Sequence, residues 1–322
     1  MKIAVITSDK VAGSVFHRIV MPHMALAKVY DDVHVTYVTG MANMSDEQIG
    51  EFDFAVAHES YWDVGTIERV RKLGVKFIYD IDDYWELEPF MLSFPQWKHI
   101  NMKHLVLNTA SNCDLVTCTT PILRSSLVAN IKNRVEIMPN GVDPDDEWWK
   151  PSPNPTWDDF RVGYVGALEH LHDIRQIFGV QNNFDIYILS TLHDMLPKGF
   201  KRFDGKRFMQ YATLYDEFNV VIAPLIVSRF NRHKSELKMI EAGFKKKPIV
   251  VSNVEPFTLL ISVKNCLTVD KPRPWNWIKQ LQRLKDSPAL REDLAESLYE
   301  DVHIQYDLKN QAVRRRQIYE SL

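Results

Sequence analysis

The sequence predicts an α/β protein with two successive doubly wound parallel sheets. Short apolar runs such as 3–7 and 54–58 alternate with amphipathic stretches along the chain. Strands that are apolar on both faces belong to parallel sheets, because helices cover both faces of such a sheet. The alternation stops at the proline-rich stretch 148–158 and then starts again, which marks a linker. A chain of 322 residues is long enough for two domains of ordinary size.

In the first half, the apolar pattern predicts six strands separated by helices or loops. The predicted strands are 3–7, 33–38, 54–58, 76–81, 114–118 and 135–138. A loop at 8–14 follows the first strand, and the predicted helices are 15–29, 64–73, 96–112 and 121–130. We therefore expect residues 1–150 to form an N-terminal Rossmann-like domain.

The second half repeats the pattern and predicts a C-terminal Rossmann-like domain over residues 151–305. Its predicted strands are 161–165, 186–189, 220–224, 248–252 and 267–269. The predicted helices of the second half are 172–178, 208–217, 235–244, 275–284, 289–304 and 308–322, and the last of them lies beyond the domain boundary. In such sheets ligands bind beyond the carboxyl ends of the strands, so two facing domains create one cleft.

Composition and charge narrow the class of protein. The chain is 45% hydrophobic and 25% charged, as in soluble globular proteins, and no apolar run approaches the roughly 20 residues of a membrane span. It opens on a strand pattern without a secretory signal, and its three cysteines, Cys113, Cys118 and Cys266, lack metal-ligand spacing. We expect buried thiols and a cytoplasmic location.

The net charge of −3 is divided unevenly between the two halves. Residues 1–150 hold 14 basic and 21 acidic residues, whereas residues 151–322 hold 25 basic and 21 acidic residues. An acidic first half and a basic second half indicate that an anionic ligand is held by the second half.

The stretch 229–253 is the best candidate for that anion site. Ser235 occupies the expected N-cap position of helix 235–244, and Lys234, Lys238 and Glu241 share one face. A helix N-terminus with a hydroxyl and a lysine suits a diphosphate, and Glu241 could accept hydrogen bonds from two ribose hydroxyls. The alternative is an amphipathic helix with solvated charges.

Polar residues also follow the strands of the first half. Gly13 and Arg18 follow the first strand, without the G-x-G-x-x-G fingerprint of dinucleotide sites, and we expect Arg18 to reach into the cleft. His58 ends the strand 54–58, where it is either a base, a donor to substrate or a structural residue. Asn140 opens a turn on the same edge of the sheet.

Asp80, Asp82 and Asp83 end or follow the strand 76–81. Carboxylates this close repel one another unless they are bound or solvated, which favours function. They form a solvated acidic turn, a Mg²⁺ or Mn²⁺ site, or a hydrogen-bonding site for a polyhydroxylated substrate.

In the second half, Gly166 ends the strand 161–165 and would let backbone N–H groups approach phosphate oxygens. His170 follows it. His170 and His172 are too close in sequence to share one face of a helix, and no third ligand is apparent, so the sequence does not favour a zinc site. The stretch 197–208 interleaves basic residues with three phenylalanines. It indicates either nucleic-acid or membrane binding, or a connection that packs its phenylalanines inward, which we favour.

In this order, the stretches resemble GT-B-fold glycosyltransferases, most closely the retaining family 4 and its relatives. The stretches that carry the resemblance are 13–18, 80–83, 140–143, 163–166, 223–225 and 234–252. The resemblance implies two Rossmann-like domains facing across a cleft, with the last helix, 306–322, crossing back to complete the first domain.

The resemblance also implies an activity: transfer of a sugar from a nucleotide-sugar donor, UDP- or GDP-linked, with retention of configuration and no obligatory metal. The acceptor, a glycan, lipid, small molecule or modified nucleic acid, would bind on the N-terminal side. Gly13 would face the donor sugar and diphosphate, and Lys234 and Ser235 would bind the diphosphate. Glu241 matches the second glutamate of the family's Glu-x7-Glu motif and would hold the ribose.

The sequence departs from the family at two points. His233 stands where the motif has its first glutamate, and Ala167 and Leu168 stand where a basic pair often binds the diphosphate. We expect Arg229, Arg232 and Lys234 to supply that charge.

Asp82, Asp83 and His58 are the candidate catalytic residues, because the family has a histidine near the acceptor at about that place. Two alternatives stay open: a glycosyltransferase that acts on nucleic-acid bases, and a GT-B-like protein that binds a nucleotide or glycan without catalysis.

Overall fold

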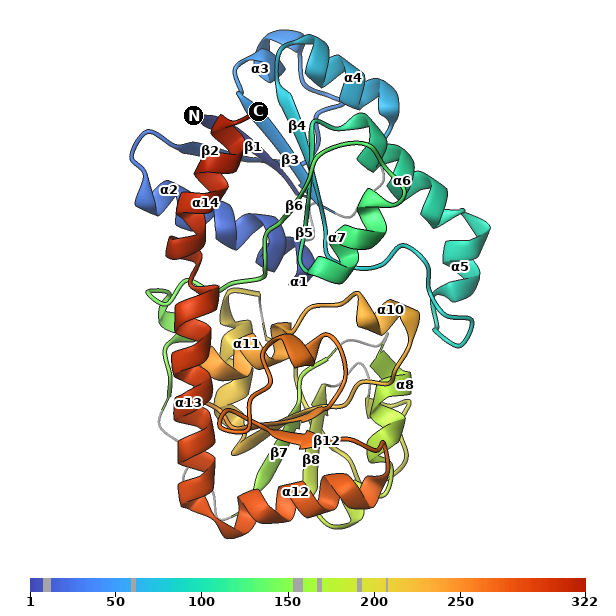
Figure 1. Ribbon diagram of the computed structural model, residues 1–322, viewed down its shortest axis with the longest axis vertical. Coiled ribbons are helices and arrows are strands. Elements are labelled where there is room, and N and C mark those ends of the chain that lie inside the picture. Colours follow the sequence, from blue (N-terminus) through green and yellow to red (C-terminus); the bar gives the residue numbers. More distant parts are fainter. Residues whose placement is uncertain (8–12, 59–61, 153–158, 167–169, 190–192, 207) are drawn as a thin grey trace.

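The computed structural model describes the chain except for residues 8–12, 59–61, 153–158, 167–169, 190–192 and 207. It contains two six-stranded parallel sheets with helices packed on both sides, the first sheet above the second in Figure 1. The predicted α/β fold with two doubly wound sheets is confirmed. Most of the predicted loop 8–14, half of the linker 148–158, and Ala167 and Leu168 lie outside the described residues.

The first sheet has the strand order β2-β1-β3-β4-β5-β6. Its strands are β1 (Lys2–Ile6), β2 (His34–Val38), β3 (Phe54–His58), β4 (Lys76–Ile81), β5 (Leu115–Cys118) and β6 (Val135–Ile137). Every residue of β3 and β5 is buried, as expected of strands covered on both faces. The order reverses between β1 and β3, and this switch point is where doubly wound sheets bind ligands.

The helices of the first half agree with the prediction except at three places. The predicted helix 15–29 is divided into α1 (Gly13–Val15), a π-helical turn (Phe16–Val20) and α2 (Met21–Val29). The predicted helix 96–112 is divided into α5 (Phe94–His99) and α6 (Met102–Asn112), because Asn101 adopts a left-handed conformation with φ of 53°. The short helix α3 (Asp46–Gly50) was not predicted. The helices α4 (Val64–Lys72) and α7 (Pro121–Val128) lie where helices were predicted.

The second sheet has the order β12-β11-β10-β7-β8-β9 and reverses between β7 and β10. Its strands are β7 (Arg161–Tyr164), β8 (Asp185–Leu189), β9 (Lys201–Phe203), β10 (Val220–Ala223), β11 (Ile249–Ser252) and β12 (Leu267–Val269). The edge strand β9 was not predicted, because three residues with two cations show no apolar pattern. The predicted helix 208–217 is a 3-10 segment, Phe208–Glu217.

The remaining helices are α8 (Leu171–Ile174), α10 (Arg229–Arg232), α11 (Leu237–Phe244), α12 (Pro274–Asp286), α13 (Pro288–Tyr306) and α14 (Leu308–Glu320). The N-cap prediction for Ser235 was wrong. Glu236 occupies the N-cap position of α11, while the Ser235 hydroxyl oxygen accepts a hydrogen bond from Asn140 Nδ2 at 2.6 Å. Ser235 therefore joins α11 to the first half of the chain instead of capping the helix.

The C-terminal helix α14 lies beside α2, on the first sheet (Figure 1). Its Ile318 and Tyr319 belong to the same core as Ile3 and Val5 of β1. Two backbone hydrogen bonds hold the start of α14 to the end of the first half of the chain. Val142 N donates to Tyr306 O and Leu308 N donates to Val142 O, both at 3.0 Å. The domain boundaries near residues 150 and 306 stay predictions.

Two further findings concern the cysteines and the lengths of the helices. All three cysteines, Cys113, Cys118 and Cys266, are free and buried, which confirms the prediction made from the strand positions of Cys113 and Cys118. Among the described residues, no helix combines the length and apolarity needed to span a membrane.

His23 on α2 binds α14. Its Nδ1 lies 2.6 Å from the carbonyl oxygen of Ile19 and its Nε2 lies 2.9 Å from the hydroxyl of Tyr319. Because a carbonyl only accepts, Nδ1 carries the proton and Nε2 accepts from Tyr319. Burial and, next, the positive charge of Arg315 lower the pKa of His23 to about 3.

This pKa predicts a pH-dependent stability. The unfolded chain binds a proton at His23 below its ordinary pKa of 6.5, whereas the folded chain does so only near pH 3, so the free energy of unfolding falls as the pH falls between these values. We expect wild type to lose about 2 kcal/mol more between pH 7 and pH 5 than His23→Gln does, measured by urea unfolding. His99→Gln, at an exposed position, should match wild type. An unchanged pH dependence in His23→Gln would contradict the assignment.

Candidate functional site

A cavity of about 340 Å³ lies between the carboxyl edges of the two sheets. Residues after β1 and β4 line one wall, and residues after β7 and β10 together with the start of α11 line the other. Most of the predicted site residues line it: Gly13, Asp82, Asp83, Gly166, His170, Lys234, Ser235, Lys238 and Glu241. The cavity therefore adjoins the switch points of both sheets, where a ligand is expected.

Glu241 is buried at the end of this cavity with three polar partners. Its Oε2 accepts hydrogen bonds from Tyr215 at 2.5 Å and from Lys238 at 2.8 Å, and its Oε1 lies 3.3 Å from His17 Nε2. Burial alone would raise the pKa of Glu241, but Lys238 and His17 outweigh it and lower that pKa to about 2. Glu241 is thus a carboxylate, and Oε1 is the oxygen with the weaker contact.

Lys234 reaches across the cavity to the first half of the chain. Its Nζ lies 2.9 and 3.1 Å from the two carboxylate oxygens of Asp83, and 4.7 Å from the centre of the Phe230 ring. Both side chains are partly exposed, so the pair contributes little stability by itself. An anion in the cavity would compete with Asp83 for Lys234.

His170 is held by a buried carboxylate that the sequence did not suggest. Its Nδ1 lies 2.8 Å from Asp173 Oδ2, while Asp173 Oδ1 accepts from the backbone N–H of Ile226 and from Asn231 Nδ2 at 2.8 and 2.9 Å. Because Asp173 accepts at Nδ1, the proton of a neutral His170 lies on Nδ1. The ring is thereby fixed in orientation at the cavity wall.

The prediction that Arg18 reaches into the cleft was wrong. The π-helical turn directs Arg18 inward, where it is fully buried and donates from Nε and Nη2 to the two oxygens of Asp80 at 2.9 and 2.8 Å. Its Nη1 donates to Asn140 Oδ1 at 3.1 Å. Burial alone would raise the pKa of Asp80, but Arg18 and then His58 hold it well below its ordinary value.

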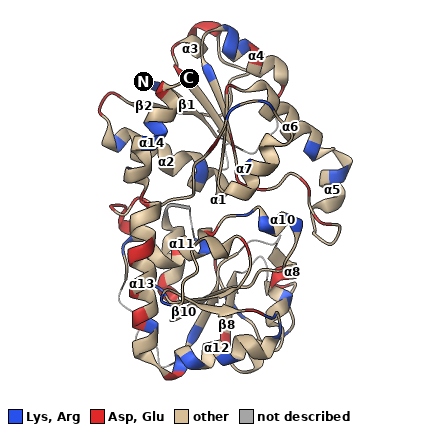
Figure 2. Cartoon of the chain, viewed as in Figure 1, with Lys and Arg blue, Asp and Glu red and all other residues tan. Residues whose placement is uncertain are grey.

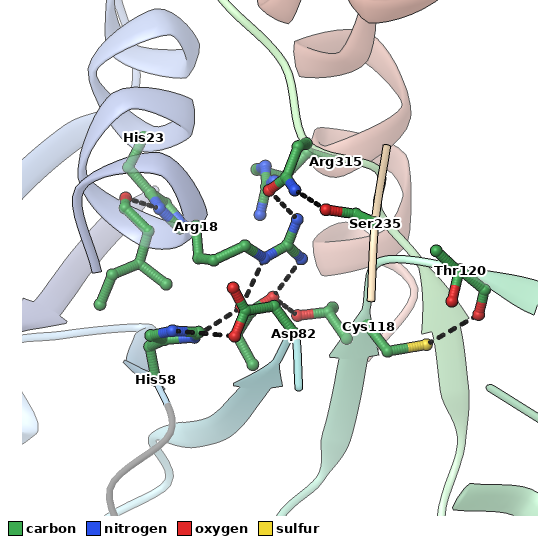
Figure 3. A network of polar contacts seen from close by, with 12 residues as sticks. Arg18, His23, His58, Asp82, Cys118, Thr120, Ser235 and Arg315 are labelled. Atoms are coloured by element: carbon green, nitrogen blue, oxygen red, sulfur yellow. Dashed lines mark hydrogen bonds and ion pairs between the residues drawn. The ribbon is translucent and has the colours of Figure 1, made fainter. Parts of the chain in front are cut away.

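His58 is also buried, and it connects Asp80 to a cavity residue. Its Nδ1 lies 2.9 Å from Asp80 Oδ1, and its Nε2 lies 3.6 Å from Asp82 Oδ1. Thr117 donates to the other oxygen of Asp80 at 2.5 Å. Figure 3 shows Arg18, His58, Asp82 and Ser235 converging on this point from different elements. His58 therefore lies between Asp80 and Asp82, a residue of the cavity lining.

These contacts argue against the metal reading of Asp80 and Asp82, because both oxygens of Asp80 are bound by Arg18. Within the described ranges, no group of three His, Cys, Asp or Glu side chains could hold a metal ion.

Two predicted phosphate-binding cations lie elsewhere. Arg232 is 57% exposed, binds Glu255 at 2.8 Å and, in the described structure, is outside the cavity lining, so we no longer assign it to the site. The Arg229 guanidinium lies 4.7 Å from the centre of the Tyr84 ring, and its backbone N–H donates to Glu88. Both arginines are therefore already bound to acidic or aromatic partners.

His233, at the position of the first motif glutamate, joins the two halves of the chain. Its ring stacks on Tyr84 with centroids 4.2 Å apart, and its Nε2 lies 2.8 Å from the Ser126 hydroxyl on α7. Burial lowers its pKa. In this chain, His233 therefore packs the second half of the chain against Tyr84 and Ser126 of the first half.

The uneven charge of the two halves does not arise mainly at the cavity, because many of the charged residues lie on outer helices. Figure 2 shows Lys and Arg along the outer helix α12 and acidic residues along α13. None of the described residues that line the cavity belongs to either helix. Three cations of the stretch 197–208 form ion pairs as well: Lys201 with Asp185, Arg202 with Asp204 and Lys206 with Glu217. The excess of positive charge in the second half of the chain is therefore partly balanced by acidic residues outside the cavity lining.

Sequence reasoning missed several residues that shape the site. His17, Trp149 and Tyr211 line the cavity, with His17 in edge contact with the other two rings at 5.9 and 6.3 Å. Trp149 belongs to the predicted linker, and Tyr211 to a 3-10 segment, so no periodic pattern marked them. The π-helical turn that directs His17 inward has no sequence signature.

No family model matches this chain, and no curated protein matches its sequence. Solved structures do match its fold. Sucrose-phosphate synthase from Thermosynechococcus elongatus is 14% identical with a TM-score of 0.69, over 100% of this chain and 98% of that one. HepE from Anabaena, solved with UDP-glucose, is 13% identical with a TM-score of 0.70, over 100% of both chains. A glycosyltransferase from Rickettsia africae is 13% identical with a TM-score of 0.66, over 99% and 98%. The chain has the GT-B fold. Membership of family 4 stays a prediction.

The Arg18–Asp80 pair gives a stability prediction. Asp80→Asn leaves the Arg18 guanidinium buried without a full counter-charge, so we expect a loss of about 3–5 kcal/mol in the free energy of unfolding. The double variant Arg18→Met/Asp80→Asn removes both charges and should be more stable than Asp80→Asn alone. Thermal and urea unfolding measure both. Losses that simply add in the double variant would refute a coupled buried pair.

Proposed function

We propose that this chain is a glycosyltransferase that transfers a sugar from a nucleoside diphosphate to an acceptor hydroxyl, with retention of configuration. The observation that carries the proposal is the cavity between two GT-B sheets, with Lys234 and Ser235 on one wall and Asp82 and Asp83 on the other. The structural neighbour HepE was solved with UDP-glucose, which supports a UDP-sugar donor before a GDP-sugar.

The second sheet would hold the donor. Lys234 and the Ser235 hydroxyl would bind the diphosphate, and His170, held by Asp173, lines the same cavity. The backbone at Gly13 and Gly166 lines the cavity without side chains, which allows close approach of the sugar and the diphosphate. Glu241 Oε1 would accept from the ribose, in competition with His17.

The first sheet would hold the acceptor. Asp82 and Asp83 line the cavity opposite the start of α11, and carboxylates can orient an acceptor hydroxyl and receive its proton. Asp83 is bound to Lys234 in this structure. When Lys234 moves to the diphosphate of the donor, Asp83 becomes available to the acceptor, so donor binding would precede acceptor binding.

The nucleic-acid alternative is weakened, since three cations of the stretch 197–208, Lys201, Arg202 and Lys206, are paired with acidic residues. A binding protein without catalysis is distinguished by experiment alone.

A panel of UDP-, GDP- and ADP-sugars tests the proposal. We expect a UDP-sugar to raise the melting temperature, by the equivalent of about 2.7 kcal/mol at 100 times its Kd, and to release UDP over time. Stabilisation by UDP-sugars without release of UDP would identify a binding protein. Neither stabilisation nor turnover with any member would refute the proposal.

Lys234→Met tests the diphosphate site. Hydrogen bonds to charged groups contribute about 1.5–3 kcal/mol, so the affinity for UDP should fall about 10- to 100-fold, measured by calorimetry. Lys271→Met removes an exposed lysine outside the cavity and serves as the control. Unchanged UDP affinity in Lys234→Met would remove Lys234 from the site.

A further inference from the structure

Hydrogen bonds through buried polar residues lead from Ser235, on one wall of the cavity, to His58, whose Nε2 lies 3.6 Å from Asp82 Oδ1 on the opposite wall. Ser235, on the wall formed by the second half of the chain, accepts from Asn140 Nδ2 at 2.6 Å, and Asn140 Oδ1 accepts from Arg18 Nη1 at 3.1 Å. Arg18 and Asp80 then form a double hydrogen bond at 2.8 and 2.9 Å. Figure 3 shows this path running from Ser235 to the Arg18 guanidinium.

The path continues on the other side of Asp80. His58 Nδ1 lies 2.9 Å from Asp80 Oδ1, and His58 Nε2 lies 3.6 Å from Asp82 Oδ1. Asp82 lines the cavity, as Ser235 does at the other end. The inner members of the path, Asn140 among them, are at most 5% exposed, so water does not replace their contacts.

The chemistry of the partners fixes the direction of the hydrogen bonds at Asn140. Arginine only donates, so the amide oxygen of Asn140 faces Arg18 and its NH₂ group faces Ser235. The Ser235 oxygen therefore accepts from Asn140, which leaves its own proton to donate. Among the contacts of the described residues, none is donated by the Ser235 hydroxyl. Because Ser235 lines the cavity, that proton is available to an anionic ligand.

We propose that Asn140 is a positioning residue that couples the donor side of the site to the acceptor side. It orients the Ser235 hydroxyl toward the donor and, through Arg18 and Asp80, helps to fix the His58 ring behind Asp82. This inference rests on the proposed glycosyltransferase function. It means that a change at Ser235 and a change at His58 affect turnover together, although neither touches the other.

The test is a double-mutant cycle measured in two backgrounds. Ser235→Ala removes one end of the path, and His58→Asn keeps an N–H near Asp80 but removes the atom that faces Asp82. The value of kcat is measured as UDP release from UDP-glucose, or from the sugar nucleotide of the panel that turns over fastest. Each variant, alone and combined, is made with Asn140 intact and with Asn140→Ala. Circular dichroism and the melting temperature confirm folding.

We expect the combined effect with Asn140 intact to differ from the product of the single effects by about threefold or more. In the Asn140→Ala background this interaction should disappear. Asn265→Ala is the matched control, because Asn265 is also buried and bonded, to Leu260 O and Asp301, but stands apart from the path. It should lower stability and leave the interaction intact.

The outcomes separate the two proposals. Independent, multiplying effects with Asn140 intact, or an interaction that persists in Asn140→Ala, would overturn the coupling while turnover upholds the glycosyltransferase. A wild-type chain that turns over no member of the panel, whether or not it binds UDP, would overturn the proposed function and, with it, this role of Asn140. An interaction lost equally in Asn265→Ala would show a general effect of stability and would also overturn the coupling.

Discussion

The buried ion pair between Arg18 and Asp80 is the interaction on which the arrangement of the site depends. Two charges without access to water are tolerated only when each meets the other in good geometry and the remaining hydrogen-bonding groups are satisfied. Here the remaining groups are satisfied by Asn140, His58 and Thr117, which follow or belong to three other strands of the first sheet. The pair therefore fixes the carboxyl edge of that sheet, and with it one wall of the cavity.

The cavity itself is electrostatically balanced rather than strongly positive. Lys234 is bound to Asp83, Lys238 to Glu241, and His170 to Asp173. An anionic ligand would gain from Lys234 by exchange, because the lysine would leave Asp83 for a phosphate of the ligand. The exchange at Lys234 crosses the cavity, so it also changes the contact between the two halves of the chain.

The sequence allowed much of the fold to be predicted, since apolar strands, proline and glycine positions and helical spacing are local properties. It also placed Gly166, Lys234 and Glu241 near the cavity, because residues after parallel strands meet at one edge of the sheet. It failed for Arg18, whose direction depends on a π-helical turn and on a carboxylate 62 residues away. It missed Asp173 for the same reason: hydrogen bonds between distant residues leave no periodic pattern.

Hydrogen–deuterium exchange with and without UDP tests the central claim most directly, namely that one cavity between the two sheets binds a nucleoside diphosphate. The account predicts that saturating UDP slows exchange in the amides of residues 234–241 and changes it in the amides around Asp82 and Asp83, because Lys234 leaves Asp83. Protection confined to other surfaces, or no change in either segment at saturation, would contradict it.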